Sequence, residues 1–171
     1  LQFKYDFIDR FIDSSDYQYC EMDTDSAYIA FSSGNIEDII KPHLRSEYQN
    51  EKGNWFPRES HQNYDKRTPG LFKEEWRGDG IIALNSKMYC VFGGDGEKYS
   101  SKGINRRQNQ LTKEEYLNVL FNQTREDCTN RGFRVKNNEV YTYEQTKTGM
   151  SYYYDKRMVL EDGVTATYLD I

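Results

Sequence analysis

The stretch YQYCEMDTDSAYIAF, Tyr17 to Phe31, decides how this chain can be interpreted. Both of its ends are rich in aromatic and β-branched residues, and the second end alternates two sets of side chains, which predicts two short strands joined as a hairpin. Asp23 and Asp25 lie at the joint. If the backbone stays extended there, the two carboxylates project to one side and Thr24 to the other.

Two carboxylates this close together repel each other, and a site that keeps both ionised needs a cation beside them. Residues 11 to 40 contain seven acids and no Lys or Arg, so nothing nearby in the sequence neutralises the pair. Oxygen ligands of this kind suit Mg²⁺ or Mn²⁺. The pattern therefore predicts a metal site at Asp23 and Asp25. The plain alternative is a polar turn, because Asp, Ser and Thr all favour turns.

The run MDTDS between two predicted strands resembles the third palm motif of family B DNA polymerases, written YxDTDS. Glu21 stands where that family has an aromatic residue, although Tyr19 is nearby. The resemblance implies that Asp25 is the direct metal ligand and that Asp23 supports the site. It also implies a DNA-directed DNA polymerase that uses Mg²⁺ or Mn²⁺ to join deoxynucleoside triphosphates to the primer of a primer-template DNA. Its chemistry would be two-metal phosphoryl transfer.

A Lys-x-Tyr segment follows, as the family order requires. Lys87 and Tyr89 lie in LNSKMYCVF, Leu84 to Phe92, which we expect to be one strand with both side chains on the same face. In the family, such a pair contacts the primer end of the duplex. As isolated residues, a Lys and a Tyr at this spacing are more often part of an ordinary solvent-facing strand.

A basic loop comes next and resembles the start of the family's thumb. Lys98, Lys102, Arg106 and Arg107 follow one another with no acid among them until Glu114. We expect Lys102, Arg106 and Arg107 to bind DNA, because phosphate contacts come mainly from such cations. A solvated loop is the alternative.

A helix is predicted directly after this loop. Thr112 and Glu115 have the spacing of a capping box, and Tyr116, Leu117 and Leu120 form an apolar stripe. These features predict a helix that begins after Thr112 and packs on a core.

The last block, Arg131 to Ile171, alternates aromatic and polar residues and predicts two strand-like stretches separated near Gly149. Segments in and before it resemble the protein-primed polymerases of Polinton (Maverick) elements and their viral relatives. These segments are Thr68 to Trp76, Tyr141 to Gln145, Asp155 to Arg157 and Asp162 to Gly163. For such a relative, a terminal priming protein joins the expected partners, and whether initiation is protein-primed stays open. The expected location is intracellular, and nuclear if the source is a eukaryotic mobile element or virus.

Other parts of the family pattern are absent from this sequence. It contains no DxxSLYP motif with the earlier palm Asp, no KxxxNSxYG fingers helix and no exonuclease carboxylates. Together with the start at Leu1 and the length of 171 residues, this favours a carboxyl-terminal fragment. Residues 1–95 would be the rear of the palm and residues 96–171 a thumb-like region. We expect this fragment alone to be inactive.

The expected fold class is α+β, a palm fragment with an acidic hairpin followed by a mixed thumb. A helix is predicted over Leu1 to Asp13 from near-helical spacing of apolar residues, and a second helical stretch from Ile36. Antiparallel strands should then run through Phe92. The most linker-like stretch is Glu47 to Pro69, which is polar and contains Gly and Pro.

Composition agrees with an ordered piece of about one domain's size, at 36% hydrophobic and 15% aromatic residues. Three widely spaced cysteines suggest neither a disulfide framework nor a zinc site, and no apolar run is long enough to predict a membrane segment. The net charge of -5 speaks against DNA binding, which usually requires a basic surface. The distribution of the charges is compatible with DNA binding, because the acids gather around the predicted metal site and the cations in the predicted thumb.

Two other classes of function stay open. A nucleotide-sugar glycosyltransferase also uses a metal-binding DxD after a strand, and binding of a nucleotide sugar with Mn²⁺ would favour it. A non-catalytic module for binding nucleic acid or another partner would be favoured if Asp25→Ala left function unchanged.

Overall fold

The computed structural model describes residues 2–101, 103–105, 108–109, 111–154, 157–163 and 165–168. The chain divides into two compact units. The first consists of Leu1–Cys20 and Ala27–Arg77, and the second of Glu21–Ser26 and Gly78–Ile171. Short helices combine with small antiparallel sheets, so the expected α+β class is confirmed at that level.

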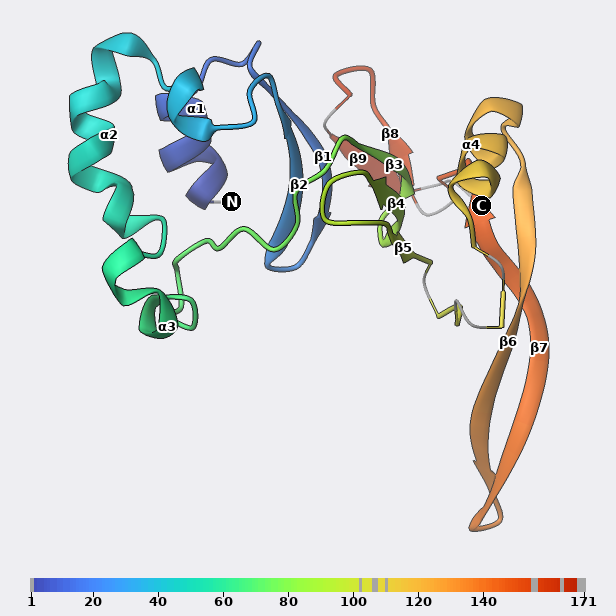
Figure 1. Cartoon of the computed structure of the whole chain (residues 1–171). Coiled ribbons are helices and arrows are strands. Elements are labelled where there is room, and N and C mark those ends of the chain that lie inside the picture. Colours follow the sequence, from blue (N-terminus) through green and yellow to red (C-terminus); the bar gives the residue numbers. More distant parts are fainter. Residues whose placement is uncertain are drawn as a thin grey trace. The chain divides into compact units, whose positions relative to one another are not determined.

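The first unit is built mainly from short helical segments (Figure 1). These are η1 (Phe3–Ile8, a π-helix), α1 (Asp9–Phe11), η2 (Ile36–Ile39), η3 (Pro42–Leu44), α2 (Arg45–Glu51), η4 (Lys52–Asn54), η5 (Glu59–His61) and α3 (Gln62–Asp65). The predicted opening helix is confirmed, but it ends at Phe11. It stops there because Ile12 takes an extended conformation and forms a bridge with Ile40. The second helical stretch begins at Ile36, as predicted, although as a 3-10 helix.

An aromatic cluster holds this unit together. Its fully buried centre is formed by Phe7, Ile8 and Phe11 of the opening helix, with Ile40 and Tyr48 from later segments. Ring pairs such as Phe7 with Phe11, whose centroids are 5.4 Å apart, add to the burial of apolar area. The spacing of the first three residues explains why this segment becomes helical, since it places all of them on one face.

The expectation of a linker over residues 47–69 is wrong. This stretch contains most of α2 and all of η4, η5 and α3, and it buries Tyr48 and Asp65. Tyr48 belongs to the aromatic cluster, and Asp65 accepts hydrogen bonds from Arg58. The polar composition of this segment suggested a linker. The segment can nevertheless fold, because its buried Asp65 is paired with Arg58 of the same segment.

The acidic stretch forms the predicted hairpin, with strands β1 (Tyr17–Asp23) and β2 (Ser26–Phe31) paired in a two-stranded sheet. The arms of this hairpin group with the first unit and its tip with the second. The tip is described with the site below.

Small sheets and one longer helix make up the rest of the second unit (Figure 1). The elements are β3 (Gly80–Asn85), β4 (Met88–Phe92), β5 (Lys98–Ser100), α4 (Lys113–Asn122), β6 (Arg125–Lys136), β7 (Glu139–Ser151), β8 (Arg157–Val159) and β9 (Ala166–Tyr168). Strands β3, β4 and β5 form an antiparallel sheet in that order, and β6–β7 and β8–β9 are separate antiparallel pairs. The predicted capping box of Thr112 and Glu115 is confirmed at the start of α4.

One hydrophobic cluster joins the three parts of this unit. Ile82 and Cys90 come from the sheet, Tyr116 from α4, and Cys128 and Met150 from the base of the β6–β7 hairpin. Leu117 and Leu120 pack against the same cluster, so the predicted apolar stripe of α4 is confirmed.

Among the described residues, no helix is long and apolar enough to cross a membrane.

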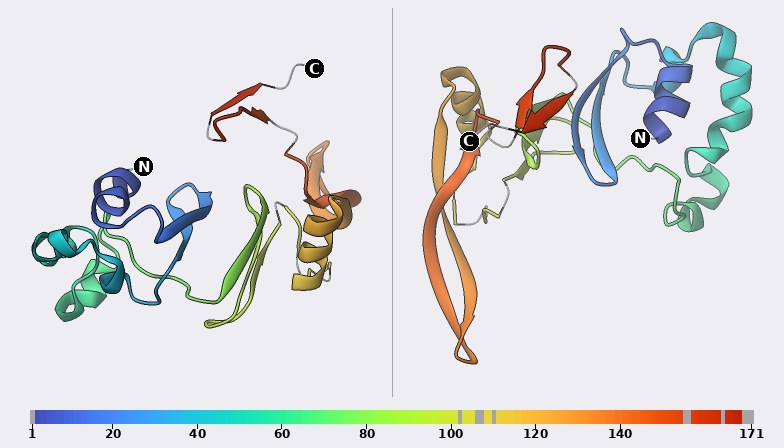
Figure 2. Two further views of the ribbon diagram at one scale, coloured as in Figure 1. Left: turned by 90° about the horizontal axis from the view of Figure 1, so that it is seen from above. Right: turned by 180° about the vertical axis from the view of Figure 1, so that it is seen from behind.

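The β6–β7 hairpin extends well past α4, as the right-hand view of Figure 2 shows. Its turn lies at Asn137 and Asn138, so the predicted break near Gly149 is wrong. Both asparagines have positive φ, 54° and 61°, which is the requirement of the tight turn that matches strand twist. Gly149 lies inside β7, where an added Cβ would collide with Cys128. This glycine therefore serves close packing and not a turn.

Candidate functional site at the acidic hairpin tip

The tip of the acidic hairpin is a tight turn at Thr24 and Asp25. Thr24 has a φ of 58°, so the backbone does not stay extended and the alternation expected for the two aspartates does not hold. Thr24 Oγ1 donates to Asp23 Oδ1 at 3.1 Å, and Ser26 Oγ donates to the Asp23 carbonyl at 3.1 Å. Asp23 is half-buried and Asp25 is exposed.

Lys87 and Tyr89 do not share one strand, which corrects the expectation for residues 84–92. Lys87 lies in the turn between β3 and β4 with a φ of 61°, and Tyr89 lies within β4. The turn begins where the Asn85 side chain accepts a hydrogen bond from the backbone N–H of Ser86 at 2.8 Å. Asn and Ser favour turns through such local bonds, and this signal in the sequence was missed.

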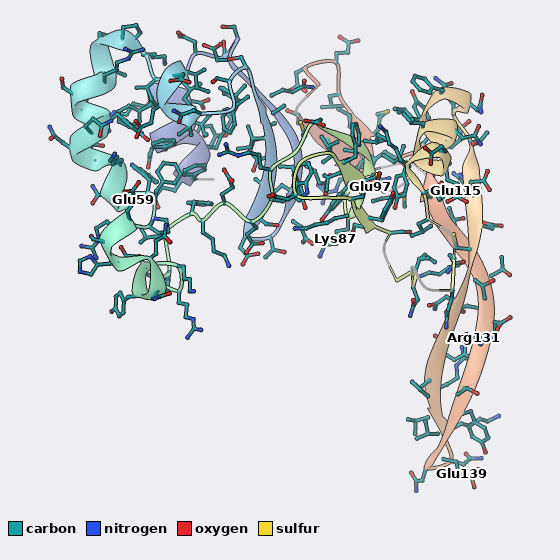
Figure 3. The ribbon with its side chains drawn as sticks, viewed as in Figure 1. Glu59, Lys87, Glu97, Glu115, Arg131 and Glu139 are labelled. Atoms are coloured by element: carbon teal, nitrogen blue, oxygen red, sulfur yellow. The ribbon has the colours of Figure 1, made fainter. Side chains whose placement is uncertain are left out.

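The β3–β4 turn lies against the acidic tip through two contacts of Lys87, and a third contact joins Lys87 to β5. Lys87 is labelled in Figure 3. Its Nζ is 2.7 Å from Asp23 Oδ1. Its backbone N–H donates to Glu21 Oε1 at 2.9 Å, and its carbonyl accepts from Ser100 Oγ at 3.0 Å. Both backbone groups and the side chain of Lys87 are thus held by three separate residues.

The contact shifts the pKa values of the groups that form it. The hydrogen bond from Lys87 lowers the pKa of Asp23, and the same bond raises the pKa of Lys87. Burial raises the pKa of Glu21; the hydrogen bond from the Lys87 backbone lowers it, and the nearby charge of Asp23 raises it. Asp23 is therefore held ionised by a cation of the protein, distant in sequence, where the sequence alone had suggested a metal.

The donors at the tip suit Mg²⁺ in kind but form only part of a site. Among the described residues, no group of three or more His, Cys, Asp or Glu side chains could hold a metal ion. Mg²⁺ usually takes one or two carboxylates and completes its shell with water and substrate phosphates. Asp25 is exposed and makes no ion pair with any described residue, whereas Asp23 is paired with Lys87. Asp25 is therefore the better ligand of the two.

The structure brings none of the other predicted DNA-binding residues that it describes to the acidic tip. Tyr89 is half-buried in β4, opposite Ala83 of β3 and Ser100 of β5. Lys102, Arg106 and Arg107 lie outside the described residues.

Glu21 and Ser100 are residues of this site that sequence reasoning missed. Glu21 was visible as the departure from the family's aromatic residue, and in the structure its carboxylate accepts the backbone N–H of the Lys87 turn. A carboxylate suits this position because Lys87 lies in the turn outside the paired strands, where its backbone N–H needs another acceptor. Ser100 carried no signal in the sequence.

No family model, no curated protein and no solved structure matches this chain. The function must therefore be argued from the residues and contacts described above.

Proposed function

We propose that the chain is part of a DNA-directed DNA polymerase similar to family B, with the acidic hairpin at its catalytic centre. Residues 1–95 would form the rear of the palm and residues 96–171 a thumb. The observation that carries the proposal is the contact between Lys87 Nζ and Asp23 Oδ1 at 2.7 Å. Lys87 of the Lys-x-Tyr segment and Asp23 of the acidic hairpin were both identified through the same resemblance, and they are in contact.

In this proposal, the residues of the tip have separate tasks. Asp25 would hold the metal, which when bound lowers the pKa of the primer hydroxyl and neutralises triphosphate charge. Asp23, held by Lys87, would keep the tip in one geometry. Lys87 remains 47% exposed, so its ammonium can meet a phosphate or base at the primer end. Small errors of position at such a centre reduce the rate strongly.

The β6–β7 hairpin supports the thumb assignment by its chemistry. Arg134 lies over the ring of Tyr143, 4.8 Å from its centroid, and Lys136 precedes the turn on an exposed strand end. Cations and exposed aromatic rings together are typical of surfaces that bind nucleic acid. Arg131 is less available, because it is paired with Glu144 at 2.5 Å.

The test is primer extension with Mg²⁺ by a polymerase-length protein that contains this chain, comparing wild type with Asp25→Asn. Binding of primer-template DNA is measured in parallel by fluorescence anisotropy. We expect synthesis to fall about 100-fold or more with DNA binding retained, because the substrates are misplaced when the metal is lost. Asp13→Asn, another exposed acid of the same segment, should change neither quantity.

Unchanged synthesis by Asp25→Asn would overturn the proposal and leave the Asp-Thr-Asp-Ser run as a polar turn. Equal losses in Asp25→Asn and Asp13→Asn would show that general acidity of the segment, and not the metal site, had been disturbed.

A further inference from the structure

The first unit has an open cleft of about 620 Å³ beside η4 and α3, far along the chain from the acidic tip. Its size is in the range that small-molecule sites occupy. Trp55, Arg58, Tyr64 and Asp65 are among the residues that line it. Glu59, which is labelled in Figure 3, begins η5, the 3-10 helix between Arg58 and α3.

Arg58 is held in the wall of this cleft by a buried carboxylate. The Asp65 side chain, 3% exposed, accepts from Arg58 Nε at 2.7 Å, from Arg58 Nη2 at 3.0 Å and from the Arg58 backbone N–H at 3.1 Å. These bonds lower the pKa of Asp65 to about 2, so the pair stays ionised at neutral pH. An arginine fixed in this way loses little further side-chain entropy when it binds a ligand.

The guanidinium keeps one edge available. Arginine has five N–H donors, and the bonds to Asp65 use Nε and one hydrogen of Nη2. Nη1 makes no hydrogen bond with any described residue, and the Arg58 side chain is 56% exposed. The remaining edge has the fork geometry that binds two oxygens of a phosphate at once.

Two aromatic residues line the cleft together with this arginine. The ring of Tyr64 is 76% exposed, which gives a flat surface for stacking. Trp55 also lines the cleft, and its buried indole N–H has no hydrogen-bond partner among the described residues. Asp65 is the only acid that lines the cleft among the described residues, and Arg58 already occupies it.

We propose that this cleft binds a nucleoside phosphate, with the phosphate on the outer edge of Arg58 and the base against Tyr64. Because Asp65 balances the charge of Arg58, recognition depends on hydrogen-bond geometry and stacking more than on net charge. We therefore expect modest affinity with weak dependence on salt. The same chemistry is offered by a free nucleotide and by one nucleotide of a single strand. The proposal does not rest on the polymerase assignment.

Fluorescence of Trp55 provides the test, since Trp76 is the other of the two tryptophans in the chain and can be replaced by Trp76→Phe. The 171-residue protein is titrated with dGMP, deoxyguanosine, inorganic phosphate and a single-stranded DNA tetranucleotide. We expect saturable binding of dGMP with a Kd below about 1 mM. Deoxyguanosine and phosphate, which each lack one half of the ligand, should bind about tenfold more weakly or worse.

Variants separate the cleft from the general surface. Tyr64→Ala should weaken dGMP binding about tenfold through loss of stacking, and it removes a largely exposed ring. Arg58→Lys should weaken binding further, because lysine keeps a charge for Asp65 but loses the fork. Lys66→Ala is the matched control, an exposed cation of the same segment that does not line the cleft, and should bind as wild type does.

Absence of saturation by dGMP would overturn the proposal, as would equal binding by Tyr64→Ala and wild type. If the tetranucleotide binds more tightly than dGMP and shares its dependence on Tyr64, the site takes a nucleotide of a strand. If the two bind equally, it takes the free nucleotide. Failure of the polymerase proposal would leave all of these results untouched, because they are measured without synthesis.

Discussion

The two longer hairpins of the chain end in similar tight turns but are held in opposite ways. The turn of β1–β2 is tied by Lys87, which donates to both Glu21 and Asp23. The β6–β7 hairpin is anchored at its base, while near its turn Phe133 is 77% and Val135 71% exposed. Isolated two-stranded hairpins are only marginally stable in water. The difference predicts that tertiary contacts at a tip, more than strand length, decide whether that tip keeps one geometry.

The largest expected effect is at the base of the β6–β7 hairpin. Tyr116 is fully buried in the cluster that also holds Cys128 and Met150. Tyr116→Ala should lower the free energy of unfolding of the second unit by about 3–5 kcal/mol, as expected for the loss of a large buried ring. Urea unfolding followed by circular dichroism measures it.

Tyr116→Phe is the matched control, because it keeps the ring and removes only the hydroxyl that donates to the Ser100 carbonyl at 2.7 Å. It should cost about 1 kcal/mol. If the alanine variant cost no more than this, the hairpin would not depend on the cluster beneath it.

The turns themselves should respond differently to glycine. Thr24 is a β-branched residue with a φ of 58°, and glycine would relieve about 1 kcal/mol of backbone strain there. Thr24→Gly should therefore slow hydrogen exchange of the β1–β2 amides, and Thr24→Ala, which keeps a Cβ, should not. Asn138→Gly should have a smaller effect on β6–β7, since asparagine tolerates positive φ. Equal gains in both hairpins would contradict the difference drawn between them.

The smallest expected effect is on the titration of Asp23. Lys87 lowers the pKa of this carboxyl in the folded protein, so its contribution to stability is present above the ordinary pKa of 3.8 and is lost as the pH falls through the lowered value. Lys87→Met should move the pKa of Asp23 upward and weaken this acid dependence. An NMR titration of the Asp23 carboxyl measures the shift.

The β6–β7 hairpin provides the control variant for this titration. Lys136→Met removes a cation beside the turn of the other hairpin and should leave the Asp23 titration as it is in wild type. A pKa for Asp23 that does not respond to Lys87→Met would mean that the contact with Lys87 is not populated in solution.

Local patterns in the sequence were sufficient for elements whose contacts are local. The acidic hairpin, the opening helix and α4 with its Thr112 cap follow from alternation, spacing and a capping box. Asn137 and Asn138 carry a turn signal of their own, but Gly149 looks like a break in the sequence, because a glycine needed for close packing cannot be told from a glycine needed for a turn.

The site was harder to predict because its key contact joins segments far apart in the chain. Asp23, Asp25 and Lys87 were all singled out from the sequence, yet the ion pair between Asp23 and Lys87 depends on how two turns meet. Thr24 and Lys87 both adopt positive φ, which residue preferences argue against. The aromatic cluster and the buried Asp65 likewise arise from tertiary packing that a polar sequence does not reveal.

The placement of the thiols provides a way to follow unfolding of one unit of the protein in solution. Cys90 and Cys128 lie buried in the second unit, where burial also raises the pKa of Cys128, whereas Cys20 is half-buried at the edge of the first unit. A thiol reacts as thiolate and only when reagent can reach it. Alkylation followed by peptide mass spectrometry therefore reports, without any engineered label, when the second unit opens as denaturant is added, with Cys20 as the more accessible reference thiol.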